Sequence, residues 1–216
     1  MKGDVINIEA HHIQAAKKIV EKIVQKITSS EKIYIISVAG ESGSGKSEMA
    51  KALQEEFIKY SVSSIILQQD DYFFLPPRSN DKKRRKDFNW IGPQEVKLDL
   101  IDEHLQQLKT GAKSVLKPLV LYNEDMITEE TVLIGDSKVI IAEGTYTSLV
   151  KYIDHKIFIA RNKFDTLESR KKRSRAAYEL DEFTDKVLEK EHQIISEHKS
   201  LANTIISRTY ELEFVS

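Results

Sequence analysis

Apolar residues follow two patterns along this chain. In one, three or four residues separate successive apolar positions, as at Met49, Leu53 and Phe57; this spacing is typical of a helix with one buried face. In the other, almost every position is apolar, which is typical of a strand buried on both faces. Such runs occupy residues 33–39, 63–68, 138–142 and 156–160. Because strands and helices alternate, we predict an α/β fold with a mainly parallel sheet between two helical layers, that is, a three-layer α/β/α arrangement.

The first 30 residues predict an amphipathic helix. Its apolar positions recur at three- and four-residue spacing, with lysines and glutamates between them. These positions are Ile13, Ala16, Val20, Ile23, Val24 and Ile27. We expect this face to pack on the domain rather than on a membrane surface, because glutamates interrupt the positive charge and no large aromatic side chain anchors the face.

Further elements follow the second apolar run. A polar, proline-containing segment covers 69–93, and a helix with Leu98, Ile101, Leu105 and Leu108 ends at Gly111. Residues 115–122 and 131–134 predict a β-hairpin insertion around the turn Asn123-Glu124-Asp125. The charged stretch 161–178 and residues 181–198 predict helices, and late strands are expected at 204–206 and 210–215.

Composition limits the classes of protein to consider. The 216 residues are 40% apolar and carry 33 basic and 34 acidic side chains, a net charge of -1. This length favours a single domain, 1–216, and the near-neutral charge makes nucleic acid an unlikely partner. The absence of cysteine excludes disulfides and thiolate chemistry and fits the cytoplasm. With no signal peptide and no apolar stretch of membrane-spanning length, we expect a soluble protein, with homo-oligomerisation left open.

The first apolar run leads into a phosphate-binding loop. The segment fits G-x-x-x-x-G-K-[ST] at every fixed position: Gly40, Glu41, Ser42, Gly43, Ser44, Gly45, Lys46 and Ser47. In such a loop the backbone N–H groups surround phosphate oxygens, the lysine reaches the β- and γ-phosphates, and the final hydroxyl binds Mg²⁺. The strand before it and the helical spacing after it make a flexible glycine-rich turn a poor alternative. We therefore expect the chain to bind ATP with Mg²⁺.

Two other buried runs end in carboxylates. Asp70 and Asp71 follow residues 63–68, and Glu143 follows 138–142. The carboxyl ends of parallel strands meet at one edge of a sheet, so these side chains are expected beside the phosphate loop. Glu143 is the better candidate for holding Mg²⁺ with Ser47. Asp70 or Asp71 could then accept the proton of an attacking hydroxyl, and spacing alone does not choose between them.

The chain resembles the uridine kinase and phosphoribulokinase family of P-loop kinases. The resemblance runs from about residue 33 to 206 and rests on ordered motifs: the phosphate loop, 69–73, Phe88-Asn89-Trp90 with Pro93, 139–144, 156–159, the arginine-rich stretch Arg170 to Arg175, and 202–206. It implies that Asp70 is the catalytic aspartate and Glu143 the magnesium-associated glutamate. It also implies a lid over about 161–180, in which Arg170, Arg173 and Arg175 would offset charge on the transferred phosphoryl group. Tyr72 and Trp90 are candidate substrate contacts.

Some positions depart from the family pattern. Ile91 and Gly92 replace an aspartate and a histidine of uridine kinases, and Val120 and Leu121 replace an expected tyrosine-aspartate pair. The half of the site that handles the nucleoside is therefore changed, which argues against uridine as the acceptor. The basic run Lys82 to Lys86, expected in a loop, could attract an anionic acceptor or nucleic acid, although a solvated tract is the commoner explanation.

These observations favour a kinase that moves the γ-phosphate of ATP to a hydroxyl of a nucleoside-like or sugar-like small molecule. Lys46 would bind the triphosphate, Ser47 and Glu143 would hold the metal, and Asp70 would activate the acceptor. The alternative is a nucleotide-dependent switch or slow NTPase acting through a protein partner. The aspartate at the acceptor position and the lid arginines disfavour the switch, since neither is needed by it.

Overall fold

The computed structural model describes residues 6–162, 164–166 and 181–215. Its α-helices are α1 (Ala10–Thr28), α2 (Lys46–Ile58), α3 (Pro77–Lys86), α4 (Leu98–Lys109) and α6 (Glu182–Ile195). Its strands are β1 (Tyr34–Gly40), β2 (Ser64–Gln68), β3 (Ser114–Leu121), β4 (Met126–Leu133), β5 (Val139–Glu143), β6 (His155–Ile159), β7 (Thr204–Ile206) and β8 (Leu212–Phe214). Short 3₁₀ turns lie at Gln69–Tyr72 (η1), Phe88–Trp90 (η2), Pro93–Glu95 (η3), Thr147–Leu149 (η4) and Ser196–Leu201 (η6).

The main sheet has the strand order β2-β5-β1-β6-β7-β8. All neighbouring strands are parallel except β7 and β8, which are antiparallel. Val38 of β1 and Gln68 of β2 both pair with Glu143 of β5, so the carboxyl ends of these three strands lie side by side. The predicted mainly parallel sheet is confirmed, together with the edge at which the site was expected.

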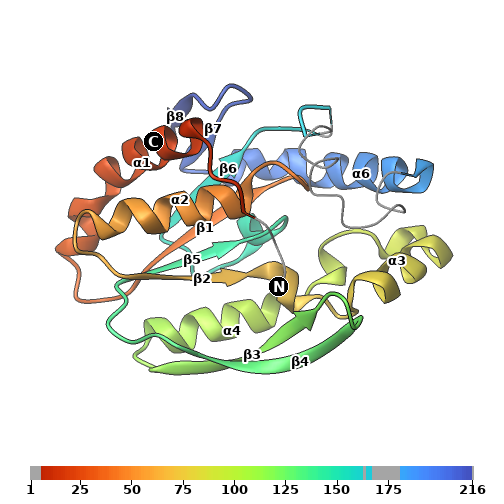
Figure 1. Cartoon of the computed structure of the whole chain (residues 1–216), viewed down its shortest axis with the longest axis horizontal. Coiled ribbons are helices and arrows are strands. Elements are labelled where there is room, and N and C mark those ends of the chain that lie inside the picture. The colour runs from red at the N-terminus through yellow and green to blue at the C-terminus, as the bar shows by residue number, and fades with distance from the viewer. Residues whose placement is uncertain (1–5, 163, 167–180, 216) are drawn as a thin grey trace.

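Helices cover both faces of this sheet (Figure 1). Ile36 and Val38 of β1 belong to a buried cluster with the apolar residues of α1 and α2. Ile35 and Ala39 of the same strand belong to a second cluster with α4 and the end of α6. Successive side chains of a strand point to opposite faces, so each strand contributes to both cores. The three-layer α/β/α arrangement is confirmed.

Helix α1 forms where expected, and four of the six predicted apolar positions, Ala16, Val20, Ile23 and Ile27, are buried. Its buried residues are His12, Ala15, Ala16, Ile19, Val20, Ile23 and Ile27. Ile13, predicted on that face, is 47% exposed. His12 lies on the buried side of the helix, where its ring bonds to Tyr210. Among the described residues, no helix is long and apolar enough to cross a membrane.

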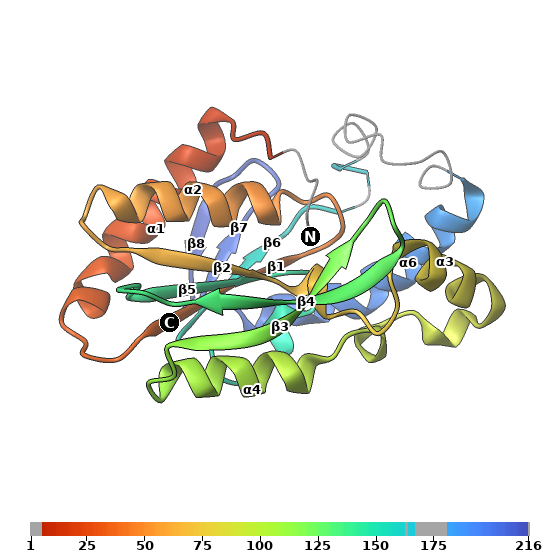
Figure 2. The ribbon, with the colours of Figure 1, turned by 60° about the horizontal axis from the view of Figure 1, so that its bottom comes forward.

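The β-hairpin insertion forms from β3 and β4, which pair antiparallel over eight residues of each strand. Figure 2 shows it beside β2, with α4 on its other side. Strand β4 begins at Met126, five residues before the predicted start at Thr131. The missed part consists of exposed and half-buried residues and contains polar side chains, so it lacks the continuous apolar run that marked the other strands.

The basic run Lys82 to Lys86 lies on helix α3, so its prediction as a loop was wrong. Asn80 is the helix's one buried residue. Without an apolar face, the helix gave no periodic signal in the sequence. Ion pairs attach it to the rest of the molecule, as described below.

The helix predicted from Arg161 does not begin there. Residues 161 and 162 are irregular and 164–166 form a turn, in which the N–H of Thr166 donates to the carbonyl of Asn162 at 3.1 Å. The rest of that stretch lies outside the described residues. The next predicted helix, 181–198, is confirmed as α6, which ends at Ile195 and continues as the 3₁₀ turn η6.

Candidate active site

The phosphate loop connects β1 to α2. Gly43 and Gly45 have φ angles of 76° and 98°, in the left-handed region that glycine adopts without strain. Nζ of Lys46 donates a hydrogen bond of 2.9 Å to the backbone carbonyl of Glu41. The loop is therefore folded around the lysine, which is also the first residue of α2. Backbone N–H groups and a positive helix end at this position suit a polyanionic phosphate chain.

Two residues that are distant from the loop in the sequence, His12 and Tyr210, support it through hydrogen bonds. The hydroxyl of Tyr210 bonds to Nε2 of His12 at 3.0 Å and to the carbonyl of Ser44 at 3.4 Å. Nδ1 of His12 accepts the N–H of Glu9 at 3.0 Å, so in the neutral ring the proton is on Nε2. Burial lowers the pKa of His12 to about 4. A Cβ atom on Gly45 would lie 2.7 Å from the Tyr210 hydroxyl, so glycine is also required by packing.

Glu143 lies at the end of β5, facing the loop. Its Oε1 accepts hydrogen bonds of 3.2 Å from the hydroxyl of Ser47 and from the amide of Gln68. Burial raises the pKa of the Glu143 carboxyl, and nearby Asp70 raises it further, while Lys46 opposes the shift. A buried carboxylate beside a hydroxyl offers the hard oxygen ligands that Mg²⁺ prefers. No three His, Cys, Asp or Glu side chains converge in the described parts of the chain, so a metal here would need ligands from the nucleotide too.

The structure separates Asp70 from Asp71. Asp71 is 2% exposed; one carboxylate oxygen accepts from Nζ of Lys117 at 2.6 Å and the other from the N–H of Val120 at 3.0 Å. It therefore fastens the turn η1 to the hairpin. Asp70 is half-buried and close enough to Glu143 to raise the pKa of that carboxyl. Of the two aspartates, Asp70 is the one on the side of the phosphate loop.

Tyr72 and Trp90 are both held by other side chains. Tyr72 is fully buried, and its hydroxyl bonds to Nδ1 of His104 at 2.9 Å. Trp90 is half-buried; its Nε1 donates to Oδ1 of Asn80 at 2.9 Å, and the ammonium of Lys83 lies 5.6 Å from its ring centre. The burial of Tyr72 assigns it to the core rather than to substrate contact, and Trp90 fixes the segment after α3.

Arg84 and Arg85 of the basic run are paired with carboxylates. Arg84 binds Glu95 through two hydrogen bonds, of 2.5 and 3.0 Å, and Glu191 of α6 at 3.0 Å. The Glu95 side chain is completely buried. Arg85 binds Asp81 at 2.8 Å and Asp181 at 2.7 Å on the surface. These contacts attach α3 to α6 and satisfy the charges of the two arginines in the run Lys82 to Lys86, which the sequence offered to an anionic ligand.

Helix α6 also reaches the phosphate loop. Nδ1 of His192 lies 2.6 Å from Oε1 of Glu41. The preceding residue, Glu191, binds Arg84 of α3, and Lys46 lies near enough to favour the ionised form of Glu191, although burial raises the pKa of that carboxyl overall. One helix thus touches the loop on one side and the segment around α3 on the other. Sequence reasoning missed this connection because no local pattern links residues 150 positions apart.

Three of the four positions that depart from the uridine kinase pattern, Ile91, Gly92 and Val120, are occupied by residues with structural contacts or deep burial. Ile91 and Val120 are each 1% exposed. The N–H of Gly92 donates to Oε1 of Glu95 at 2.8 Å. The family's nucleoside-binding carboxylate therefore has no equivalent at Ile91. The predicted lid residues Arg170, Arg173 and Arg175 lie outside the described residues.

The family model of the phosphoribulokinase / uridine kinase family matches residues 35–163, more than half of the chain. The chain belongs to this family. It is 30% identical over 136 residues to a uridine kinase of Shewanella pealeana, covering 61% of this chain and 64% of the relative. It is 31% identical over 129 residues to a uridine kinase of Halalkalibacterium halodurans, covering 58% and 59%. The chain thus aligns with about three fifths of the length of these relatives.

Solved kinase structures share the fold. A putative fructose transport system kinase from Silicibacter sp. TM1040 superposes with a TM-score of 0.63 at 16% identity, covering 86% of this chain and 93% of that one. D-glycerate 3-kinase from Cryptococcus neoformans var. grubii superposes with a TM-score of 0.61 at 13% identity, covering 96% and 100%. At these identities the likeness shows the P-loop kinase fold and does not identify a substrate.

Proposed function

We propose that this protein is an ATP- and Mg²⁺-dependent phosphotransferase that moves the γ-phosphate of ATP to a hydroxyl of a small molecule. The observation that carries the proposal is the meeting of three strand ends. The phosphate loop follows β1, Asp70 follows β2, and Glu143 ends β5 with its carboxylate 3.2 Å from the Ser47 hydroxyl. Family membership and the shared kinase fold support the same reaction class.

Binding of the triphosphate begins at the loop. Lys46 would exchange its hydrogen bond to the Glu41 carbonyl for the β- and γ-phosphates, and the N–H groups of the loop would hold the remaining phosphate oxygens. The hydrogen bonds of Tyr210 to His12 and to the Ser44 carbonyl keep the loop in this shape. Mg²⁺, when bound, neutralises charge that develops on the phosphates, and Ser47 and Glu143 are the residues that would hold it.

Transfer requires a hydroxyl in line with the γ-phosphate. Asp70 would orient that hydroxyl and accept its proton as the new oxygen–phosphorus bond forms and the bond to ADP breaks. Asp71 cannot take this role without losing its bonds to Lys117 and Val120. Arg170 and Arg173 of the predicted lid would stabilise the charge on the transferred group and exclude water.

The test combines binding and turnover. Calorimetry should detect binding of ATP in the presence of Mg²⁺, and ADP release should rise when a mixture of nucleosides, sugars and polyols is added. Asp70→Asn should retain ATP binding and lose transfer by about 100-fold to 10,000-fold, the range for a general base. Full transfer by this variant would contradict the role of Asp70, and a wild-type protein that does not bind ATP would contradict the function itself.

A further inference from the structure

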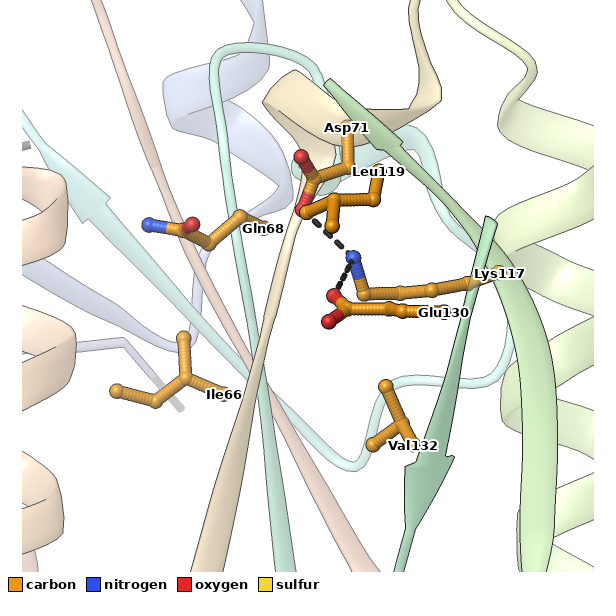
Figure 3. Close-up of a pocket in the computed structure, with 7 residues that line it drawn as sticks. All are labelled: Ile66, Gln68, Asp71, Lys117, Leu119, Glu130 and Val132. Carbon is orange, nitrogen blue, oxygen red and sulfur yellow. Dashed lines mark hydrogen bonds and ion pairs between the residues drawn. The ribbon is translucent and has the colours of Figure 1, made fainter. Parts of the chain in front are cut away.

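A pocket of about 260 Å³ lies between the edge strand β2 and the β3–β4 hairpin (Figure 3). Its apolar wall consists of Ile66, Leu119 and Val132, and its polar wall of Gln68, Asp71, Lys117 and Glu130. The pocket borders the proposed reaction centre at two points. Gln68 donates to Glu143, the proposed metal-associated carboxylate, and Asp71 directly follows Asp70 in the turn η1.

Lys117 is the one cation among the residues that line this pocket. Its ammonium binds Asp71 at 2.6 Å, Glu130 at 2.7 Å and the carbonyl of Pro118 at 3.1 Å. A lysine ammonium has three N–H donors, and these contacts use all three. The side chain is only 4% exposed. An anionic ligand could therefore gain a bond to Lys117 only by breaking one that already exists.

The charges on the polar wall of the pocket also disfavour an anionic ligand. Asp71 and Glu130 contribute two carboxylates against the one ammonium of Lys117, and Gln68 of the same wall bonds to a further carboxylate, that of Glu143. Figure 3 shows that one oxygen of Glu130 faces Lys117. The Glu130 side chain is 37% exposed, so a ligand can reach it. Such a surface offers hydrogen-bond acceptors and repels negative charge.

The two arginines of the basic tract on α3 add no free charge to this balance. Arg84 and Arg85 are each bound to two carboxylates, as described above. The sequence had suggested the run Lys82 to Lys86 as an attraction for a phosphorylated or acidic acceptor. In the structure the charges of its two arginines are paired with Glu95, Glu191 and the surface aspartates.

We infer that the acceptor of the proposed kinase carries no anionic group, and that Glu130 binds a hydroxyl or amino donor of it in this pocket. The inference rests on the proposed function and narrows its substrate class to neutral polyols, sugars, nucleosides and amino alcohols. Sugar acids and sugar phosphates are excluded, because they would bring negative charge to a wall whose one ammonium is fully bonded.

The experiment sorts acceptors by charge. ADP release from ATP and Mg²⁺ is measured with four pools built on the same carbon skeletons: neutral sugars and nucleosides, amino sugars and amino alcohols, sugar acids, and sugar phosphates. The first or second pool should stimulate ADP release at least about tenfold more than the acidic pools, since a hydrogen bond to a charged group is worth that factor or more. The best single acceptor is then used with two variants.

Glu130→Gln should lower kcat/KM for that acceptor about tenfold while leaving the affinity for ATP unchanged, because Lys117 keeps its bonds to Asp71 and Pro118. Glu129→Gln is the matched control: Glu129 is the exposed neighbour on the opposite face of β4, and its loss should change neither value. Best stimulation by an acidic pool, or a Glu130→Gln enzyme with wild-type kcat/KM, would overturn the inference and leave the kinase function intact. No stimulation by any pool would contradict the kinase function and the inference together.

Discussion

The hydroxyl of Ser47 and Oε1 of Glu143 are 3.2 Å apart, although 96 residues separate them in the chain. Their contact joins the amino terminus of α2 to the end of β5. It is the point at which a metal bound to the triphosphate would meet the protein, and it gives the first prediction.

Glu143→Gln keeps the shape and the hydrogen bonds of the side chain but removes its negative charge. The Mg²⁺ concentration that gives half-maximal activity should rise about tenfold or more, as is usual when a group that supports a metal is lost. Binding of ATP in EDTA should persist, because Lys46 and the loop are untouched. Magnesium titrations of ADP release, with Glu129→Gln as the control, measure this; an unchanged magnesium requirement would rule out the assigned role.

Gly45→Ala should damage the phosphate loop specifically. The new methyl group would lie 2.7 Å from the hydroxyl of Tyr210, and the backbone has φ 98°. Gly111→Ala is a close match, with φ 109° but no atom within 4 Å of the added Cβ. Both substitutions should cost about 1–2 kcal/mol of backbone strain. Only Gly45→Ala should also abolish ATP binding, as measured by calorimetry on folded protein; equal binding by the two variants would disprove the packing argument.

Adjacent arginines of α3 should differ sharply in their effect on stability. Arg84→Met leaves the carboxylates of Glu95 and Glu191 buried without their partner, which costs about 3–5 kcal/mol in comparable cases. Arg85→Met breaks two surface ion pairs and should cost at most about 1 kcal/mol. Urea denaturation measures both, and similar losses for the two variants would show that the Arg84 network is not buried as described.

His12 should make the fold sensitive to mild acid. Burial holds its folded-state pKa at about 4, below the ordinary value of 6.5. The neutral ring therefore contributes stability that is fully present above about pH 6.5 and is lost as the pH falls toward 4. His12→Gln, which keeps an N–H group near Tyr210, should lose less stability between pH 7 and pH 4.5 than the wild type in urea denaturation. Burial also lowers the pKa of His155 to about 4, so part of the acid sensitivity should remain in both proteins. If the His12→Gln variant and the wild type lose the same stability between pH 7 and pH 4.5, the assignment to His12 is contradicted.

The features predicted from the sequence are those encoded by neighbouring residues. The phosphate loop, the buried strands and the carboxylates that follow them have short patterns, and parallel pairing then fixes where Asp70 and Glu143 meet. Spacing left the choice between Asp70 and Asp71 open. The position of one further residue, Lys117, decides it, because Lys117 binds Asp71. The β-hairpin was also expected, because its strands are partly apolar.

Features held by distant polar partners could not be predicted. Helix α3 has no apolar face and depends on Arg84, whose partner Glu191 is 107 residues away. The burial of His12 on α1 was not predicted either, and its partner Tyr210 is 198 residues away. Tyr72 was a substrate candidate by its place in a motif, and its partner His104 shows why it belongs to the core. Hydropathy patterns contain no information on such pairs.

The position of the hairpin affects solubility as well as chemistry. Within the described part of the chain, strand β2 is the last strand on its side of the sheet, so one row of its backbone N–H and C=O groups has no neighbouring strand there. Unprotected edges of this kind promote aggregation by pairing with other chains. The hairpin stands beside β2 and is fastened by the salt bridge between Lys117 and Asp71. The hairpin therefore shields this edge, and removal of the salt bridge is expected to promote self-association of the chain.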